Sequence, residues 1–416
     1  MSTDLGSRRS QALSASYRLF YDEPFEPIRG EGVWLFDKNG VPHLDAYNNV
    51  ASVGHCHPAV VRAIAEQSAR LNTHTRYLHP AIIDYAEDLL SEFPESLNNL
   101  TMTCTGSEAN DLAIRIAQCY TGGTGLLVTG WAYHGVTALL ADISPSLATG
   151  LRLADHVGLI EAPNSYRSSN FVDSVKAAIV KMQRQGVKPA ALIVDSIFSS
   201  DGVFVPSKGD LAAAARLVHE AGGIYIADEV QAGFGRTGVH RWGFQHDTVI
   251  PDLVTLGKGM GNGYPVAGVV GPRTLHEEFG HQQRYFNTYG GNPVSCRAAH
   301  AVLDVLRLEN LQSSALQVGI YLKRRLQALA ERFEIIGDVR GAGLFLGVEL
   351  VQDRRTKRPA TQAAALVVNQ MRHRQVLISA TGPAANVLKI RPPLVFDFAN
   401  ADLLVERLEL TLQTLS

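Results

Sequence analysis

The sequence predicts an α/β fold in which a large domain with a mainly parallel sheet is joined to a smaller α+β domain. Between residues 100 and 270, short apolar runs alternate with segments of helical periodicity. This order gives parallel strands with helices on both faces of the sheet. The last hundred residues mix short strands with helices and indicate the smaller domain. A length of 416 residues, 46% of them hydrophobic, is sufficient for two domains.

The composition indicates which kinds of binding partner and which cellular compartment to expect. A net charge of −2 argues against nucleic acid or an anionic membrane as the main partner. No apolar run approaches the roughly 20 residues that span a bilayer, and residues 1–9 are polar, without the apolar core of a signal peptide. The four cysteines are scattered without Cys-x-x-Cys spacing, so we expect a reducing, cytoplasmic location.

The first elements are an irregular arm, a hairpin and a helix. Residues 1–30 are polar and interrupted by proline, which predicts the arm. Residues 33–36 and 41–44 flank an Asn-Gly turn and predict the hairpin. His55 and His57 stand just before the predicted helix start at Pro58, and no second ligand cluster follows at zinc spacing. We expect a loop there and no metal.

A strand at residues 100–104 leads into a predicted helix with a capping box. Thr105 and Glu108 have the spacing of that motif, and apolar residues recur at helical intervals after it. Gly106 and Ser107 would then present backbone N–H groups at the positive end of a helix, which favours a phosphate. A plain strand–helix turn is the alternative.

Two further strands are predicted at residues 126–128 and 190–194, and a helix over 211–221 that ends at a Gly-Gly pair. Tyr133 follows the first of these strands and could stack on a flat heterocycle, or simply belong to the core. Asp195 ends the second strand.

Asp228 and Lys258 are the pair around which the chain is organised. Asp228 ends the apolar strand 224–227, and Lys258 stands between two glycines thirty residues later. Acids at the carboxyl ends of such strands lie where open α/β sheets bind ligands. Pyridoxal 5′-phosphate (PLP) requires an amine for a Schiff base and a carboxylate that keeps its pyridine nitrogen protonated. A solvated acid and a surface lysine are the alternative for this pair alone.

Residues 233–238 fit the Gly-x-Gly-x-x-Gly pattern of dinucleotide-binding loops, but no helical periodicity follows them. We therefore reject nicotinamide or flavin binding.

The C-terminal region completes the smaller domain. A last helix should begin near Asp402, capped by Asn400, and Lys389 and Arg391 should share one face of their strand. The other expected elements are strands at 266–270, 344–350 and 387–391, and helices around 294–307 and 312–333.

Five motifs occur in order along almost the whole chain: residues 106–110 (Gly-Ser-Glu-Ala-Asn), 133–135 (Tyr-His-Gly), 228–238, 258–259 and 287–293. Together they resemble the class III aminotransferases, PLP enzymes of fold type I. The resemblance implies an N-terminal arm and part of the small domain in residues 1–55, the large PLP-binding domain in 56–310, and the rest of the small domain in 311–416.

The resemblance also implies roles for individual residues. Lys258 would be the Schiff-base lysine and proton carrier, and Asp228 the partner of the pyridine nitrogen. Thr288 would reach the phosphate of the neighbouring subunit's cofactor, which implies a homodimer with shared active sites. The remaining cofactor-binding residues would be Gly106 and Ser107 at the phosphate, Tyr133 on the ring, His134, and Gln231 near the phenolic oxygen.

Within this family, residues 48–58, 71–79 and 382–393 resemble the ethanolamine-phosphate phospho-lyase branch. This implies β-elimination of phosphate from O-phosphoethanolamine or a similar phosphorylated amine, giving acetaldehyde and ammonia. Class III enzymes usually carry Glu where this chain has Asp195. The shorter acid would leave a gap or change the arginine partner, which speaks against ordinary transamination.

Two other functions stay open at this point, an ω-aminotransferase and a non-catalytic PLP-binding regulatory protein. A lyase needs a second anion site for the substrate phosphate, although a surface charge or an interface salt bridge explains each candidate equally well. The candidates are Arg76, Arg391, Lys389, Asn49 and His79, with Tyr17 and Arg18 of the arm.

Overall fold

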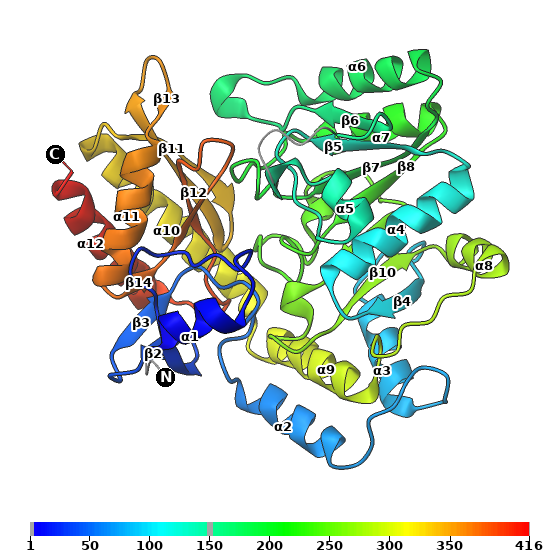
Figure 1. Cartoon of the computed structure of the whole chain (residues 1–416), viewed down its shortest axis with the longest axis horizontal. Coiled ribbons are helices and arrows are strands. Elements are labelled where there is room, and N and C mark those ends of the chain that lie inside the picture. The colour runs from blue at the N-terminus through cyan, green and yellow to red at the C-terminus, as the bar shows by residue number, and fades with distance from the viewer. Residues whose placement is uncertain (1–3, 148–152, 416) are drawn as a thin grey trace.

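A computed structural model describes residues 4–147 and 153–415 (Figure 1); expectations for residues 1–3 and 416 lie outside these ranges. Its largest sheet has the strand order β4-β10-β9-β8-β7-β5-β6. Only β10 runs antiparallel to its neighbours, so the predicted mainly parallel sheet is confirmed. The strands are β4 (Asn99–Thr103), β5 (Gly125–Thr129), β6 (Val157–Ile160), β7 (Pro189–Asp195), β8 (Ile224–Asp228), β9 (Leu253–Leu256) and β10 (Ala267–Gly271).

Helices cover both faces of this sheet. Ile193 of β7 packs in the hydrophobic cluster of α4 (Gly106–Thr121) and α8 (Arg273–Gln282). Its neighbours Leu192 and Val194 point the other way, into the cluster of α6 (Phe171–Arg184) and α7 (Asp210–Glu220). Burial on both faces explains why the central strands read as continuous apolar runs.

Two smaller sheets stand beside the large one (Figure 1). In the first, β14 (Val376–Leu377) pairs in parallel with β3, so segments from the two ends of the chain share one sheet. The predicted hairpin is present as β2 and β3. The other strands are β1 (Pro27–Glu31), β2 (Trp34–Asp37) and β3 (Pro42–Asp45) in that sheet, and β11 (Ile336–Ala342), β12 (Phe345–Asp353), β16 (Val387–Ile390) and β15 (Ser379–Thr381) in the second, with β13 (Arg358–Pro359) paired to β12.

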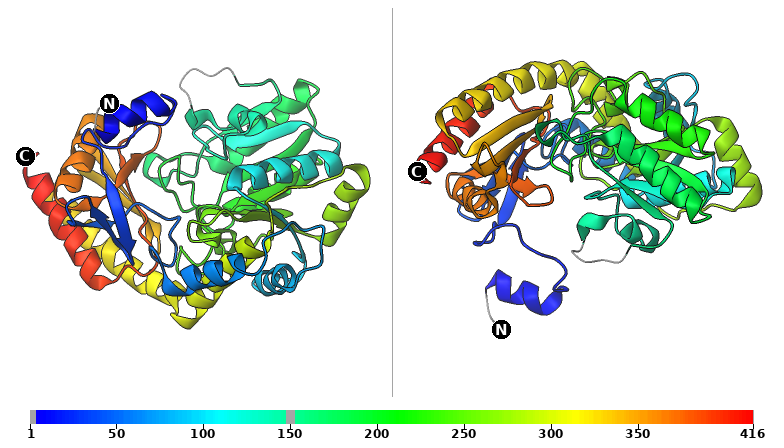
Figure 2. Two further views of the ribbon diagram at one scale, coloured as in Figure 1. Left: turned by 60° about the horizontal axis from the view of Figure 1, so that its bottom comes forward. Right: turned by 90° about the horizontal axis from the view of Figure 1, so that it is seen from above.

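The helices of the smaller part pack on the outside of its sheets, and α10 is the longest of them (Figure 2). No helix among the described residues is long and apolar enough to cross a membrane. The remaining helices are α2 (Pro58–Ser68), α3 (Pro80–Leu90), α5 (Ala138–Asp142), α9 (Pro293–Leu308), α10 (Leu311–Arg332), α11 (Thr361–His373) and α12 (Phe398–Gln413), with single 3-10 turns at Pro145–Leu147, Ser165–Arg167, Gly243–His246 and Lys258–Met260.

Two expectations about the chain ends are wrong. The arm is not irregular throughout, because Asp4 caps a helix, α1 (Leu5–Ala12), which stands off from the rest of the chain (Figure 2). The last helix begins at Phe398, and Asp397 rather than Asn400 caps it. The Asp397 carboxylate accepts from the Asn400 N–H at 2.8 Å, and the Asn400 side chain accepts from the Asp397 N–H at 3.1 Å. Asn400 is therefore the third helical residue of a capping box.

The glycine-rich stretch 233–238 forms turns, as expected for a segment that opens no helix. Gly238 has φ +84°, and a Cβ there would lie 2.6 Å from the Leu316 Cα of α10. This glycine therefore lets the turn pack directly against α10.

The two histidines that precede α2 contact different carboxylates. His55 contacts Asp45, and His57 contacts Glu309.

Candidate active site

Seven of the eight residues predicted to bind the cofactor line one cavity, at the carboxyl ends of the central strands and the start of α4. The eighth, Thr288, is exposed elsewhere on the surface. Three residues without a predicted role complete the lining. The full set is Gly106, Ser107, Asn110, Tyr133, His134, Gly135, Asp228, Val230, Gln231 and Lys258.

The N-terminus of α4 forms one wall of the cavity. The predicted capping box is present, and the Glu108 side chain accepts from the N–H groups of Cys104 and Thr105. Within the described chain, the N–H groups of Gly106 and Ser107 make no hydrogen bond. Two free donors at the positive end of a 16-residue helix can hold a phosphate.

Gly135 allows the next loop to approach this helix start. Its φ is +147°, and a Cβ would lie 2.6 Å from Ser107 Oγ and 2.5 Å from Leu140 Cδ1. The loop is tied down where the Val136 N–H donates to Ser107 Oγ. The exposed ring of Tyr133 is thereby placed at the cavity.

Asp228 ends β8 as a buried carboxylate that is held by three hydrogen-bonding neighbours. Its Oδ2 accepts from Asn110 Nδ2 at 2.9 Å and lies 2.7 Å from His134 Nδ1, and its Oδ1 accepts from the Val230 N–H at 3.1 Å. Asn110 also accepts from Thr255 Oγ1 of β9 at 2.6 Å. These contacts fix the carboxylate in one orientation.

Asn110 is the main residue that we did not predict. It lies four residues after Gly106, which places it one turn further along the same side of α4. Its presence in the motif 106–110, together with this spacing, was the signal that could have found it.

Lys258 follows β9 in a strained turn. Its φ is +32°, in the left-handed region that side chains rarely adopt, and Ser52 Oγ donates to the next carbonyl, that of Gly259, at 2.7 Å. Burial lowers the pKa of the Lys258 ammonium to about 8, and the nearby Arg391 guanidinium contributes, while Asp228 and Asp195 act in the opposite direction. An amine with this pKa is available as a nucleophile and base near neutral pH.

Arg391 and Asn49, two predicted substrate residues, both donate to Gln231 Oε1, each at 2.7 Å. Arg391 is 6% exposed, and its guanidinium lies 4.7 Å from the centre of the Tyr47 ring. Its hydrogen-bond partner is thus a neutral amide. Burial lowers the pKa of Arg391.

Asp195 does not pair with this arginine. Its two oxygens accept from the N–H groups of Ile197 and Ser199, at 3.1 and 2.9 Å. It stands beside Asp228 in the register of β7 and β8, and burial, reinforced by Asp228, raises its pKa. The short side chain therefore folds onto its own turn.

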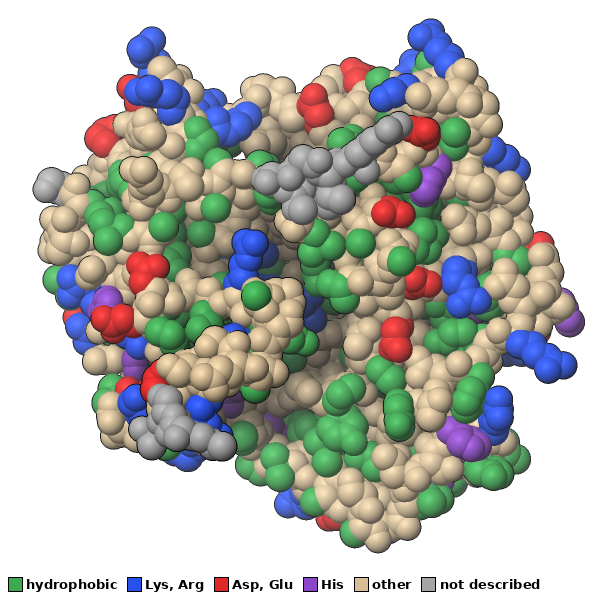
Figure 3. Space-filling model, in the orientation of Figure 1, with side chains coloured by type: hydrophobic (Ala, Val, Ile, Leu, Met, Phe, Trp, Pro, Cys, Tyr) green, Lys and Arg blue, Asp and Glu red, His purple; other side chains and the backbone are tan. Residues whose placement is uncertain are grey.

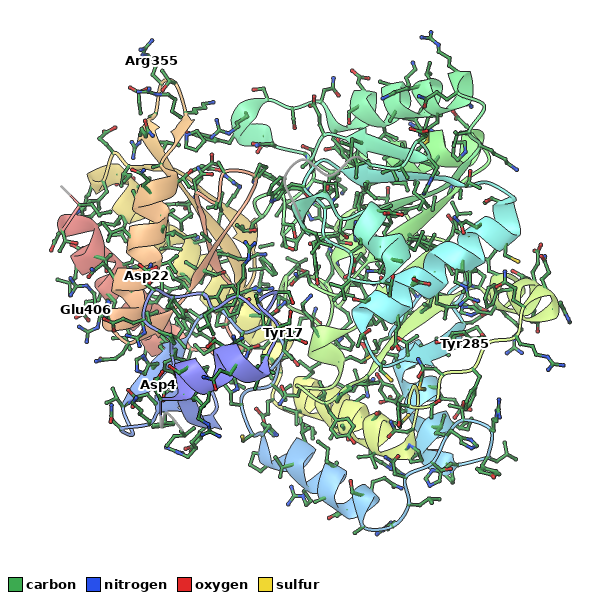
Figure 4. The ribbon with its side chains drawn as sticks, in the orientation of Figure 1. Asp4, Tyr17, Asp22, Tyr285, Arg355 and Glu406 are labelled. Carbon is green, nitrogen blue, oxygen red and sulfur yellow. The ribbon has the colours of Figure 1, made fainter. Side chains whose placement is uncertain are left out.

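The other predicted substrate residues do not line the cavity of their own chain. Arg76 is exposed and lies over the ring of Phe286, 3.8 Å from its centre. His79 caps α3, where its Nδ1 accepts from the Ala81 N–H. Tyr17 and Arg18 are exposed on the N-terminal arm, and Figure 4 shows Tyr17 at the part of the arm that faces the middle of the molecule.

Comparison with known proteins gives the family. The model of the class III aminotransferases matches residues 21–412. The chain belongs to this family. An alanine–glyoxylate aminotransferase 2-like protein of Drosophila melanogaster is 42% identical, over 95% of this chain and 84% of that protein. The ethanolamine-phosphate phospho-lyase homolog 1 of Caenorhabditis elegans is 36% identical, over 94% and 90%.

Among solved structures, a phospholyase from Arthrobacter in complex with phosphoethanolamine has a TM-score of 0.96 and 43% identity, over 99% of this chain and all of that one. A transaminase from Virgibacillus has a TM-score of 0.86 and 26% identity. The predicted fold type I and the likeness to the phospho-lyase branch are therefore confirmed.

The cavity of this class III enzyme fits PLP on three counts. The carboxylate of Asp228 is buried at the cavity and is held in place by Asn110, His134 and the Val230 N–H, which suits it to a protonated ring nitrogen. Two free N–H groups of α4 are suited to the phosphate. Lys258, with its lowered pKa, lines the same cavity and is suited to the aldehyde.

Proposed function

We propose that this protein is a PLP-dependent phospho-lyase that eliminates phosphate from O-phosphoethanolamine or a similar phosphorylated amine. Water completes the reaction, and the products are acetaldehyde, ammonia and inorganic phosphate. The observation that carries this choice is the likeness to the Arthrobacter phospholyase, whose structure contains phosphoethanolamine and which this chain matches from end to end. The C. elegans relative supports the same branch.

When bound, PLP would supply an electron sink for the charge that develops on the substrate carbon next to nitrogen. The Lys258 amine would remove the proton from that carbon, for which its lowered pKa suits it. The Asp228 carboxylate would hold a proton at the ring nitrogen, and Gly106 and Ser107 would bind the cofactor phosphate. Tyr133 would cover one face of the ring.

The anionic end of the substrate requires cations near Lys258. Arg391 meets this requirement because its guanidinium is bonded to Gln231 rather than to a carboxylate. Figure 3 shows a hollow in the middle of the face seen in Figure 1, with Lys or Arg side chains at its edge. Because Asp195 is turned onto its own backbone, it leaves Arg391 free to face an incoming anion.

A homodimer would bring Thr288 to the neighbouring cofactor phosphate. Large apolar side chains are exposed around Thr288 and on the loop before α3, including Tyr289, Tyr77 and Leu78, the last of which is 99% exposed. Exposed apolar groups of this density mark contact surfaces. The α1 helix has no buried residue in the single chain, and a second subunit would give it a surface to pack against.

The second candidate function is amine transfer to a keto acid, which the names of the Drosophila relative and of human alanine–glyoxylate aminotransferase 2 favour. The residues that face the cofactor serve both reactions. The difference lies in what leaves the substrate, phosphate or the amino group.

The experiment compares both activities of one holoenzyme preparation. O-phosphoethanolamine alone is assayed for phosphate and acetaldehyde, and L-alanine with glyoxylate is assayed for glycine. We expect phosphate release to dominate. Glycine formation without detectable phosphate release would establish the aminotransferase instead.

A further inference from the structure

Residues 258–263 form the turn that carries Lys258, and this lysine turn is strained at two positions. Lys258 has φ +32° and Asn262 has φ +49°, both in the left-handed region that side chains rarely adopt. Such a conformation costs free energy and persists only where the surrounding structure holds the backbone in place. The contacts of the lysine turn therefore determine where the Lys258 amine lies.

A short segment that follows β3 makes these contacts. Ser52 Oγ donates to the Gly259 carbonyl at 2.7 Å. Asn262 Oδ1 accepts from the Val53 N–H at 2.9 Å, and Asn262 Nδ2 donates to the Gly54 carbonyl at 2.8 Å. Three hydrogen bonds thus join the lysine turn to a segment that lies more than 200 positions earlier in the chain.

Ser52 connects the lysine turn to a second part of the chain. It is 1% exposed, and its carbonyl accepts from the Leu394 N–H at 2.7 Å, in the segment after β16. Among the described residues, the Ser52 hydroxyl is the only donor to the Gly259 carbonyl. Without this hydroxyl the carbonyl would lose its partner, and the turn around Lys258 could relax toward a less strained conformation.

The position of the turn matters because burial controls the reactivity of the Lys258 amine. Its side chain lines the cavity, and burial lowers its pKa to about 8. Arg391 lowers the pKa further, whereas Asp228 and Asp195 raise it, and Lys389 of β16 also interacts with the amine electrostatically. A relaxed turn would expose the amine to water, so its pKa would rise toward the usual value.

We propose that Ser52 is a positioning residue, which holds the lysine turn in its strained conformation and keeps the Lys258 amine buried at the cofactor. The inference rests on the role proposed above for Lys258 and goes beyond it, because it assigns the placement of this amine to one hydroxyl group. It applies to phosphate elimination and to amine transfer alike, since the same lysine serves both reactions.

The test compares Ser52→Ala, which removes the hydroxyl, with Ser295→Ala as the matched control. Ser295 is also 1% exposed, and its hydroxyl donates to a backbone carbonyl, that of Pro265, at 3.0 Å. It does not line the cavity. Each variant therefore loses a buried hydroxyl that donates to a carbonyl, but only Ser52→Ala loses it at the lysine turn.

Two further variants test the same clamp. Ser52→Cys keeps a side chain of similar size with a weaker donor. Asn262→Gly removes both side-chain bonds to Val53 and Gly54, and glycine adopts the left-handed conformation freely. These two variants decide the question if Ser52→Ala does not fold.

Two measurements distinguish positioning from a general loss of stability. The first is the midpoint, in pH, of the rate at which the apoenzyme binds PLP covalently. The second is the division of the effect between kcat and KM for O-phosphoethanolamine, or for L-alanine with glyoxylate if the wild type releases no phosphate. The melting temperature of each variant records its stability.

We expect Ser52→Ala to raise the midpoint for covalent PLP binding by about one pH unit, which lowers the rate at pH 7 about tenfold. Its kcat should fall about 10- to 100-fold, because a small displacement of a catalytic group has an effect of this size, and KM should change by less than threefold. Ser52→Cys should lie between wild type and Ser52→Ala, and Asn262→Gly should also raise the midpoint. Ser295→Ala should lose stability and keep both the midpoint and kcat.

A wild-type midpoint and kcat in Ser52→Ala, or equal changes in Ser295→Ala, would overturn the proposal. Borohydride reduction of the wild-type holoenzyme, followed by peptide mapping, separates this failure from that of the proposed function. A label on Lys258 with an unaffected Ser52→Ala variant refutes the role of Ser52 alone, whereas a label on another lysine refutes the role of Lys258 as well. A wild type that transfers the amine without releasing phosphate refutes only the lyase function.

Discussion

Replacing Asp228 by Asn should abolish most of the turnover while leaving the fold intact. The carboxylate is held by three donors, from His134, Asn110 and Val230. An asparagine fits the same space, but its neutral amide cannot hold a proton on the pyridine nitrogen. Loss of one preorganised electrostatic partner costs about 2.7–4 kcal/mol in the transition state, so kcat should fall about 100- to 1,000-fold.

The same substitution has a smaller effect on stability. One oxygen of the asparagine can still accept from the Val230 N–H, but its NH₂ group meets the donors of His134 and Asn110. Both donors bond to Oδ2 in the wild type. His134 can accept from the new NH₂ group as its other tautomer, so Asn110 Nδ2 is the donor that loses its acceptor, which costs about 1–3 kcal/mol. The measurements are kcat at saturating substrate, cofactor content by absorbance, and the melting temperature.

Glu229→Gln is the matched control, because Glu229 is the adjacent buried acid and does not line the cavity. Its oxygens accept from Ser196 and from the N–H groups of Gly243 and Phe244. This variant should lose stability and keep kcat within a few-fold of wild type. Near-normal turnover in Asp228→Asn with PLP bound would refute the assignment of the acid.

Three further predictions concern the lysine, the dimer and the last helix. The pKa of Lys258 is about 8 rather than 10.5 because the amine is buried. The rate at which the apoenzyme binds PLP covalently should therefore rise with pH up to about 8 and then level off. A rate that still rises tenfold per pH unit above pH 9 would contradict this prediction. Mixing the inactive variants Lys258→Ala and Thr288→Ala should restore activity. Each hybrid dimer would contain one site with both Lys258 and Thr288 intact. Hybrid dimers that form but show no activity would exclude a shared site. Asp397→Ala should destabilise the protein by about 1 kcal/mol through loss of the α12 cap, measured by urea unfolding, and an unchanged midpoint would show that the cap contributes nothing.

The large sheet was predictable because its strands are buried on both faces. Their short apolar runs, bounded by glycines and acids, mark the strands and their ends, and the capping box at Thr105 marks the start of α4. The smaller sheets were harder to predict, since β14 pairs with β3 across more than 300 residues of sequence and no local pattern encodes that distance. The cap of α12 was misplaced because Asp397 and Asn400 are both good cap residues, and only their reciprocal bonds distinguish them.

The sequence indicated most of the residues that line the cavity, but not the hydrogen bonds between them. The motif 106–110 contains Asn110, but the contact with Asp228 that gives it a role is visible only in the structure. Gln231 joins Asn49 to Arg391, residues 342 positions apart in the chain (391 − 49). The candidates Arg76 and Tyr17 are exposed and lie outside the lining of the cavity.

The most direct test of phosphate elimination is the number of turnovers that the holoenzyme completes on O-phosphoethanolamine without any keto acid. A lyase regenerates its cofactor in every cycle, so phosphate and acetaldehyde should accumulate in a 1:1 ratio over hundreds of turnovers per site. An aminotransferase would stop once each cofactor had taken up one amino group. Continuous 1:1 release is what we predict, and a halt after one equivalent per site, without phosphate, would contradict it.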